Sequence, residues 1–307
     1  MEAKVYIIIL NWNGWRDTVE CVESCLRVTY PNYKILIVDN GSTDESVKEL
    51  KARFPQVQML CLPENRYYAG GNNVGIRHAL AAGAEYIMLL NNDTVVHPDF
   101  LNSLVAIMEE YPTLAAVGGT LYHDRNFNII QNTGGHIDFK TGKVFTIGNG
   151  EEDIGQYQQK REVDFICGAA ILIRANLIEK IGFLDESFML YGEESDWCLR
   201  AKKRGYRSLF VPNSKVFHKG AVSSASLKHI AMYFNVRNKI WLINRHGNFM
   251  ERIFYHCLSL LYFYPKLVLG RVFKKETKLL LPSIKGILHG YFKSPDNNNK
   301  RKDFISL

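Results

Sequence analysis

Apolar and polar positions alternate in blocks along the first 120 residues. Short, continuous apolar runs are each followed by a segment whose apolar residues recur at helical spacing. Apolar runs without inward and outward alternation are typical of a parallel sheet that is buried on both faces. The pattern therefore predicts an α/β fold with a mostly parallel central sheet flanked by helices. The predicted strands are Val5–Leu10, Lys34–Val38, Gln58–Leu62, Tyr86–Leu90 and Ala115–Val117, and the predicted helices are Asp17–Leu26, Glu45–Phe54, Asn73–Ala82 and Asp99–Glu110.

Polar, turn-rich segments follow the first four of these strands. Turns favour Asn, Gly, Asp and Ser, so each segment taken alone needs no ligand to explain it. Ligands of such sheets bind beyond the carboxyl ends of the strands, however, and four segments in succession predict a ligand crevice along one edge. The segments are "NWNG" (11–14), "DNGSTD" (39–44), "PENRYYAGGNN" (63–73) and "NNDT" (91–94).

The fourth segment places a carboxylate, Asp93, almost directly after a buried strand. This carboxylate either caps the next helix or binds a hard cation such as Mg²⁺ or Mn²⁺. Mg²⁺ usually takes one or two protein carboxylates and completes its shell with substrate phosphates and water. One Asp is therefore not too few, and the candidates for a second protein ligand are Asp39, His97, Asp99 and His218.

A second group of carboxylates lies in "LYGEESD" (190–196), at the start of a predicted helix. The helix dipole favours acidic residues there, so a structural explanation is available. Three of them (Glu193, Glu194 and Asp196) nevertheless predict a general base that takes a proton from a hydroxyl. The glycines of "AGGNNVG" (69–75) suit a helix start that binds a diphosphate, but the segment lacks the spacing of a dinucleotide-binding fold.

Charge divides the chain into two parts. Residues 219–307 carry a balance of +12 and residues 1–218 a balance of −5, within a net charge of +7. A basic tail suits an anionic partner, and no nucleic-acid motif accompanies it, so we expect a phospholipid surface. Residues 253–273 have the length of a membrane span but include Pro265, Lys266 and Arg271, which favours an interfacial amphipathic region. Packing on the body or at a homo-oligomer interface is the structural alternative.

The expected compartment is the cytoplasm, at the membrane's cytoplasmic face. The six cysteines form no regular framework, which is typical of a reducing environment. The apolar run at the N-terminus is too short for a signal peptide. The expected division is residues 1–245 as the catalytic body, 246–293 as a basic helical region and 294–307 as a disordered tail.

Eight segments in order, from about Val5 to Asn238, resemble glycosyltransferase family 2, whose members have the GT-A fold. They include "IILNWNG", "ILIVDNGSTD", "NRYYAGGNNVGI", "MLLNNDT", "ICGAAILIR" and "GFLDESFMLYGEESDWCLRAKKRG", followed by "VFH" and "VRN". The residues of these motifs are most similar to those of the rhamnosyltransferase-like branch. Enzymes of that branch move sugars from dTDP-rhamnose or related donors to cell-surface polysaccharides and lipid-linked glycans. The resemblance implies an inverting glycosyltransferase.

The resemblance also implies residue roles. Asp93 matches the metal ligand of the D-x-D motif, and His218 matches a histidine that some members add to the metal. Glu194 matches the catalytic base, with Glu193 or Asp196 as its alternatives. The positions implied to bind the nucleotide-sugar are Asn11, Trp12, Asn13, Asp39, Gly70, Gly71, Asn72, Asn73, Asn91, Asn92 and, near the diphosphate, Arg237.

Two departures from the family pattern affect these expectations. Asn91 occupies the first D-x-D position, so a metal would depend on Asp93 and a further ligand such as His218. Glu194 stands where the family more often has Asp, and its side chain is one methylene longer. The rival hypotheses are a catalytically weak, glycan- or nucleotide-binding scaffold, which Asn91 permits, and a nucleotidyltransferase, whose basic phosphate loop is absent after the first strand.

Overall fold

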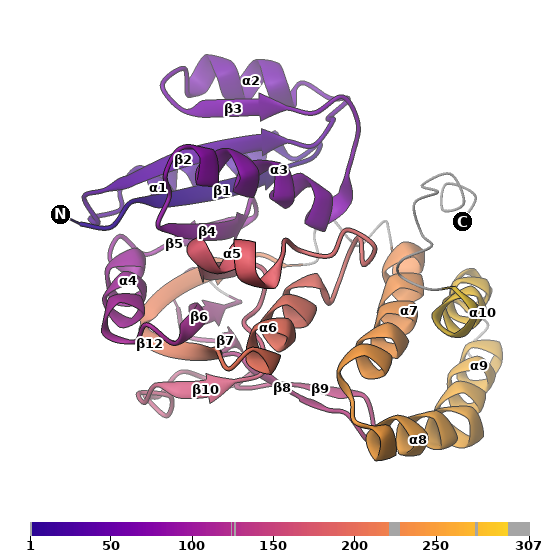
Figure 1. The fold of residues 1–307 in the computed structure, drawn as a ribbon. Helices are drawn as coiled ribbons and strands as arrows, with labels where there is room; N and C mark the ends of the chain where they lie inside the picture. The colour runs from indigo at the N-terminus through magenta and orange to yellow at the C-terminus, as the bar shows by residue number, and fades with distance from the viewer. Residues whose placement is uncertain (1, 124, 126, 221–227, 274–275, 294–307) are drawn as a thin grey trace.

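A computed structural model describes residues 2–123, 125, 127–220, 228–273 and 276–293 of the chain. A mixed sheet forms its centre, with strands in the order β10-β12-β6-β11-β4-β1-β2-β3 (Figure 1). β5 pairs with β12, β7 pairs with β6, and β8 and β9 form a separate hairpin. The strands are β1 (Val5–Asn11), β2 (Tyr33–Asp39), β3 (Gln58–Cys61), β4 (Tyr86–Asn91), β5 (Thr94–Val96), β6 (Leu114–Tyr122), β7 (Ile130–Asn132), β8 (Gly135–Asp138), β9 (Lys143–Thr146), β10 (Arg161–Val163), β11 (Ala170–Arg174) and β12 (Arg207–His218).

Helices cover both faces of this sheet, as the apolar runs predicted. α3, α5, α6 and α7 contribute to the apolar core on one face, and α1, α2 and α4 to the core on the other. Strands β1, β2, β3 and β4 are parallel, which puts their carboxyl ends at one edge. The helices are α1 (Trp15–Cys25), α2 (Ser46–Arg53), α3 (Tyr67–Ala81), α4 (Phe100–Glu110), α5 (Asn176–Ile181), α6 (Glu193–Lys203), α7 (Lys228–His246), α8 (Phe249–Leu258), α9 (Tyr264–Phe273) and α10 (Thr277–Phe292), with a π-helical turn at Ser259–Phe263 between α8 and α9.

One predicted boundary is wrong in a way that matters for the site. Helix α3 begins at Tyr67, six residues before the predicted start, so the glycines of "AGGNNVG" lie inside the helix. A Cβ on Gly71 would lie 2.5 Å from Leu10 Cδ1, and one on Gly75 would lie 2.6 Å from Ile8 Cγ2. Gly71 and Gly75 therefore allow α3 to pack closely on β1.

The C-terminal helices lie on the far side of the molecule from α4 (Figure 1). Helix α10 packs along α7, where the Tyr233 hydroxyl is 2.7 Å from His289 Nδ1 and Trp241 Nε1 donates to the Lys293 carbonyl. Of the 20 large apolar side chains that are exposed in the described part of the chain, 14 lie between Phe249 and Phe292. Residues Phe249–Phe273 are long and apolar enough to cross a membrane by length and composition alone. The expected tail, 294–307, lies outside the described residues.

Candidate active site

The carboxyl ends of β1 and β2 hold the first part of the site. Asn11 pairs with Asp39 across the two strands, and Asn11 Nδ2 donates to Asp39 Oδ1 at 2.7 Å. Asp39 also accepts hydrogen bonds from the Ser42 amide (3.0 Å) and hydroxyl (2.6 Å), which explains why this carboxylate is buried. Trp12, between these polar residues, is 43 % exposed. An exposed indole beside a fixed carboxylate is a suitable surface for stacking and hydrogen bonding a heterocyclic base.

The polar side chains after β4 point in two directions, one towards α1 and the other towards His218. Asn92 Nδ2 donates to Thr18 Oγ1 at 3.0 Å, so this amide holds the start of α1 in place. Asn91 Nδ2 lies 3.4 Å from His218 Nε2. Asp93 Oδ1 lies 3.3 Å from the same ring nitrogen. The antiparallel pairing of β5 with the end of β12 sets His218 opposite Thr94 and so beside Asp93. The tertiary structure thus brings together two residues, Asp93 and His218, that are 125 positions apart in the sequence.

His218 is oriented by a residue that the sequence reasoning missed. Its Nδ1 donates to Gln131 Oε1 on β7 at 2.6 Å, which leaves Nε2 facing Asp93. Histidines that bind metals usually donate the other ring N–H in this way. Burial favours the neutral form of Asp93, yet the hydrogen bond and charge of His218 hold the pKa of Asp93 below its ordinary value. A carboxylate and an imidazole are thus both presented at one point.

These two donors fit a divalent cation. Two neighbouring ligands of an octahedral ion with bonds of about 2.1 Å lie about 3 Å apart, close to the 3.3 Å between Asp93 Oδ1 and His218 Nε2. Among the described residues no group of three or more His, Cys, Asp or Glu side chains is placed to hold a metal. The other two candidates of this region, His97 and Asp99, line a separate cavity of about 610 Å³ with Lys215.

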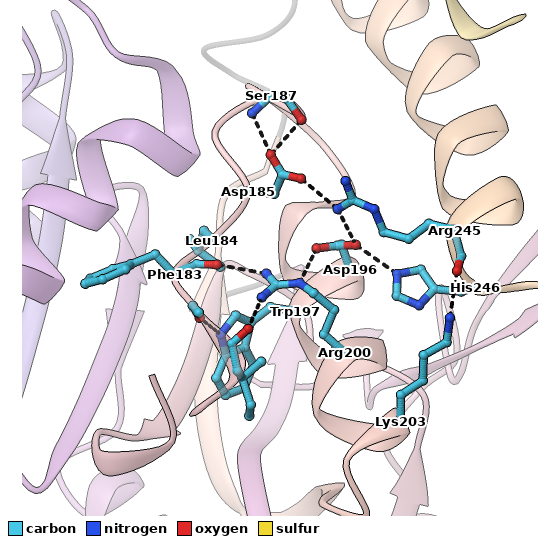
Figure 2. A network of polar contacts seen from close by, with 12 residues as sticks. Phe183, Leu184, Asp185, Ser187, Asp196, Trp197, Arg200, Lys203, Arg245 and His246 are labelled. Carbon is cyan, nitrogen blue, oxygen red and sulfur yellow. Dashed lines mark hydrogen bonds and ion pairs between the residues drawn. The ribbon is translucent and has the colours of Figure 1, made fainter. Parts of the chain in front are cut away.

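The acidic cluster at the start of α6 separates into three environments. Glu194 is half-buried, and burial raises its pKa although the amides of residues 192, 194 and 195 favour its charged form. Glu193 is buried and its Oε2 has no hydrogen-bond partner, and burial beside Glu194 raises its pKa well above the ordinary range. Asp196 points elsewhere, into a network with Arg200, Arg245 and His246 (Figure 2). Glu194 is therefore the carboxylate of the three best placed to act on a ligand.

Residues of the "ICGAA" segment lie close to both Asp93 and Glu194. Burial raises the pKa of the Cys167 thiol to about 12, and the negative charges of both Glu194 and Asp93 contribute. A Cβ on Gly168 would lie 2.8 Å from the Tyr68 hydroxyl and 3.6 Å from Glu194 Cδ, so only glycine leaves this space open. The Tyr68 hydroxyl donates to the Gly168 carbonyl at 2.6 Å. In the sequence, these residues were notable only because the "ICGAAILIR" segment is one of the motifs that resemble the family.

Several of the residues expected to bind the nucleotide-sugar lie in helices α3 and α7. Asn72 Nδ2 donates to the Tyr68 carbonyl within α3, and Asn73 bonds the backbone of Leu184. Gly70 and Gly71 are buried in the same helix. Arg237, expected near the diphosphate, is fully buried and donates to the carbonyls of residues 187 and 188. Its guanidinium thereby supports the loop that leads into α6.

Fold and family follow from comparison with known proteins. The chain resembles the mannosyltransferase PcManGT of Pyrobaculum calidifontis, solved with GDP-Man and Mn²⁺, with a TM-score of 0.59 at 14 % identity over 96 % of this chain and 88 % of that one. It resembles TarS of S. aureus with a TM-score of 0.58 at 12 % identity, over 95 % and 82 % of the two chains. The sheet and its flanking helices are thus the GT-A fold of nucleotide-sugar transferases.

The family model for glycosyl transferase family 2 matches residues 6–182. The chain belongs to this family and is a glycosyltransferase. It is 25 % identical over 258 residues to the dTDP-rhamnosyl transferase RfbF of Shigella flexneri, covering 80 % of this chain and 81 % of the relative. It is 25 % identical over 291 residues to the low-salt glycan biosynthesis hexosyltransferase Agl10 of Haloferax volcanii, covering 92 % and 90 %. A third relative, the N-acetylglucosaminyl-diphospho-decaprenol L-rhamnosyltransferase of Mycobacterium tuberculosis, is 25 % identical over 234 residues, covering 69 % and 75 %.

Proposed function

We propose that this enzyme transfers rhamnose or a similar sugar from a dTDP- or UDP-linked donor to a hydroxyl of a cell-surface polysaccharide or lipid-linked glycan. The observation that carries the proposal is that two groups lie close to the "ICGAA" segment. One is the Asp93–His218 pair, and the other is the half-buried Glu194. Two of the three relatives above are named rhamnosyltransferases, which supports the choice of sugar.

Asp93 and His218 would hold the divalent ion, Mg²⁺ or Mn²⁺. Such an ion, when bound, offsets the negative charge that develops on the departing diphosphate. The hydrogen bond from His218 Nδ1 to Gln131 would keep His218 Nε2 turned towards Asp93. Because the neighbouring D-x-D position is Asn91, Asp93 is the one carboxylate that this motif offers to the ion. Trp12 and Asp39 would bind the pyrimidine base at the carboxyl ends of β1 and β2, and Asn11 and Asn13 would hold that segment in place.

Glu194 would act as the general base. The acceptor oxygen forms a bond to the anomeric carbon while the bond from that carbon to the diphosphate oxygen breaks. The hydroxyl proton passes to a Glu194 carboxylate oxygen, and the nucleoside diphosphate leaves. A single displacement of this kind inverts the anomeric carbon. Burial raises the pKa of Glu194, and a base whose pKa lies nearer the working pH accepts a proton more readily in the transition state.

Replacement of Glu194 tests this assignment. Glu194→Gln keeps the side-chain size but cannot accept the proton, so we expect transfer to fall at least about 100-fold while nucleotide diphosphate binding persists. Glu193→Gln is the matched control, because Glu193 is buried beside it and its raised pKa already favours the neutral form. Near-full activity of Glu194→Gln would refute the assignment. If a panel of sugar donors with Mg²⁺ or Mn²⁺ gave no diphosphate release, a nucleotide-binding scaffold would be favoured instead.

We also propose that the helices α8 to α10 dock on an anionic membrane surface. Leu261 and Phe273 are 82 % and 81 % exposed, and the described helices carry basic residues such as Lys266 and Lys285 among these apolar positions. Apolar insertion combined with Lys and Arg is the composition of interfacial helices. Peripheral binding of this kind would bring the enzyme to a lipid-linked acceptor at the membrane.

Flotation with vesicles tests the membrane proposal. Leu261→Lys and Phe273→Lys should lower the fraction that floats with phosphatidylserine vesicles, because a charge replaces an inserted apolar side chain. Ile154→Lys is the control, since Ile154 is 80 % exposed but lies in the loop before β10. Equal flotation of all three variants and the unchanged protein would contradict the docking surface. Loss of flotation in the Ile154 variant would mean that the binding is not confined to α8–α10.

A further inference from the structure

Helix α7 lies beyond the family-matched residues, yet it contacts the segment that leads into the acidic start of α6. We infer that α7 is the positioning element of the catalytic base. In this inference Arg237 and Asn238 fix the backbone before Glu194, and Arg245 and His246 fix the first turn of α6 after it. The inference rests on the proposed role of Glu194 and adds the residues that keep this carboxylate in place.

The segment before α6 has an unfavourable backbone. Met189, Tyr191 and Gly192 have φ angles of 63°, 69° and 92°. Residues other than glycine lose roughly 1–2 kcal/mol in this left-handed region. Such a conformation persists only where the surrounding structure holds it, and it is common at active sites. The chain between Phe188 and Glu193 therefore depends on contacts from outside the segment.

Arg237 and Asn238 supply the first set of these contacts. Arg237 is fully buried, with its guanidinium carbon 4.1 Å from the centre of the Trp241 ring, so its orientation is fixed by packing. The Arg237 Nη2 and the Asn238 Nδ2 each donate to more than one carbonyl of the segment. The acceptors are the carbonyl oxygens of Ser187, Phe188, Leu190 and Tyr191, at distances of 2.7 to 2.9 Å. The strained backbone is thus held by two consecutive residues of one helix.

Arg245 and His246 supply the second set, two turns further along α7. Figure 2 shows the Arg245 guanidinium between the carboxylates of Asp185 and Asp196, at 2.6 and 3.0 Å from its Nη1. His246 Nε2 lies 2.8 Å from Asp196 Oδ1. Asp196 is in the first turn of α6, two residues after Glu194, and Asp185 lies before the strained segment. Helix α7 therefore bonds to residues that precede Glu194 and to a residue that follows it in the sequence.

The nucleotide half of the site is held by different contacts. Asp39 is bonded by Asn11 and Ser42 at the ends of β1 and β2, and Asp93 is paired with His218 on β12. Disturbing α7 should therefore change the chemical step and leave donor binding almost unchanged. A displacement of about 1 Å in a reacting group is enough to lower the rate roughly 100-fold. Glu194 would also lose amide hydrogen bonds that favour its charged form.

Steady-state kinetics of the full chain tests the inference. Asn238→Ala removes the amide that bonds three carbonyls, and we expect kcat to fall about 10- to 100-fold while the donor KM changes less than about twofold. The acid limb of the kcat/KM profile should move to higher pH, because Glu194 loses amide support. Arg237→Lys keeps the charge but cannot reach two carbonyls at once, and we expect a smaller fall than for Arg237→Ala.

Two controls separate positioning from general damage. Asn244→Ala removes a bond from α7 to His256 of α8, one residue before Arg245, and should leave kcat unchanged. Val105→Ala leaves a cavity in α4, and it should lower the melting temperature without a shift of the pH profile. If Asn238→Ala does not fold, Arg245→Lys is measured in the same way.

The outcomes distinguish this inference from the proposed function. Full kcat and an unmoved pH profile in Asn238→Ala and Arg245→Lys, with Glu194→Gln inactive, would overturn the role of α7 and leave the base in place. An active Glu194→Gln would overturn the base itself. A change of donor KM as large as the change of kcat would also overturn the inference, since α7 would then support the whole site.

Discussion

Asp196 tests whether the third acidic residue of the α6 start acts in structure or in chemistry. Its carboxylate is fully buried and accepts hydrogen bonds from Arg200 Nε at 2.7 Å, Arg245 Nη1 at 3.0 Å and His246 Nε2 at 2.8 Å. Asp196→Asn keeps the shape of the side chain but removes the negative charge that pairs with Arg200 and Arg245. We expect the variant to be markedly less stable at neutral pH.

The magnitude follows from the pKa of the buried group. Burial favours the neutral form of Asp196, but His246, Arg200 and Arg245 outweigh it and lower its pKa from 3.8 to about 2. One pKa unit corresponds to about 1.4 kcal/mol, so the charged form contributes about 2 kcal/mol to the free energy of unfolding. Removal of one partner of a fully buried ion pair costs about 3–5 kcal/mol. The value for Asp196 is smaller because the Arg200 and Arg245 side chains are 17 % and 28 % exposed.

Thermal and urea unfolding measure the effect. With an unfolding entropy of about 2.1 cal/mol/K per residue, a loss of about 2 kcal/mol lowers the melting temperature of the 307-residue chain by about 3 °C. The folded pKa of Asp196 is depressed, so its contribution is complete above the unfolded value of 3.8 and disappears as the pH falls towards about 2. The stability difference between the two proteins should therefore shrink below about pH 4.

A matched substitution controls for the loss of a charge in general. Asp99→Asn replaces a carboxylate that is 62 % exposed, and we expect the melting temperature to change by less than about 1 °C. An Asp196→Asn protein as stable as the unchanged enzyme at pH 7, with transfer abolished, would refute the structural assignment. That result would return Asp196 to the list of possible catalytic bases.

Three further predictions concern the site itself. Gln131→Ala should raise the divalent ion concentration needed for half-maximal diphosphate release about 10- to 100-fold, because His218 loses its orienting bond, and an unchanged titration would exclude that role. Gly168→Ala places a Cβ 2.8 Å from the Tyr68 hydroxyl, so we expect at least a tenfold fall in kcat at an unchanged melting temperature, and normal turnover would contradict the packing. The rate should fall on the acid side at a pH above 4.5, where the raised pKa protonates Glu194, and a flat profile down to pH 4.5 would speak against this base.

Local pattern was enough for most of the secondary structure. Strands β1, β2 and β4 are buried apolar runs, and buried runs separated by amphipathic helices are typical of a parallel sheet. The failure at α3 has a physical cause, because Gly and Asn are poor helix formers and the residues of "AGGNN" read as a loop. Tertiary packing outweighed this propensity, since only glycine at 71 and 75 allows the helix to lie against β1.

The residues of the site were largely visible in the sequence, but their grouping was not. The sequence by itself determined the apolar runs, the turn-rich segments that end them and the acidic start of α6. Only the tertiary structure decided that β12 brings His218 beside Asp93, that Gln131 orients His218, and that Arg237 donates to the loop before α6. Strand order and the burial of a guanidinium depend on contacts between segments that are distant in the sequence. A local pattern of apolar and polar residues does not specify such contacts.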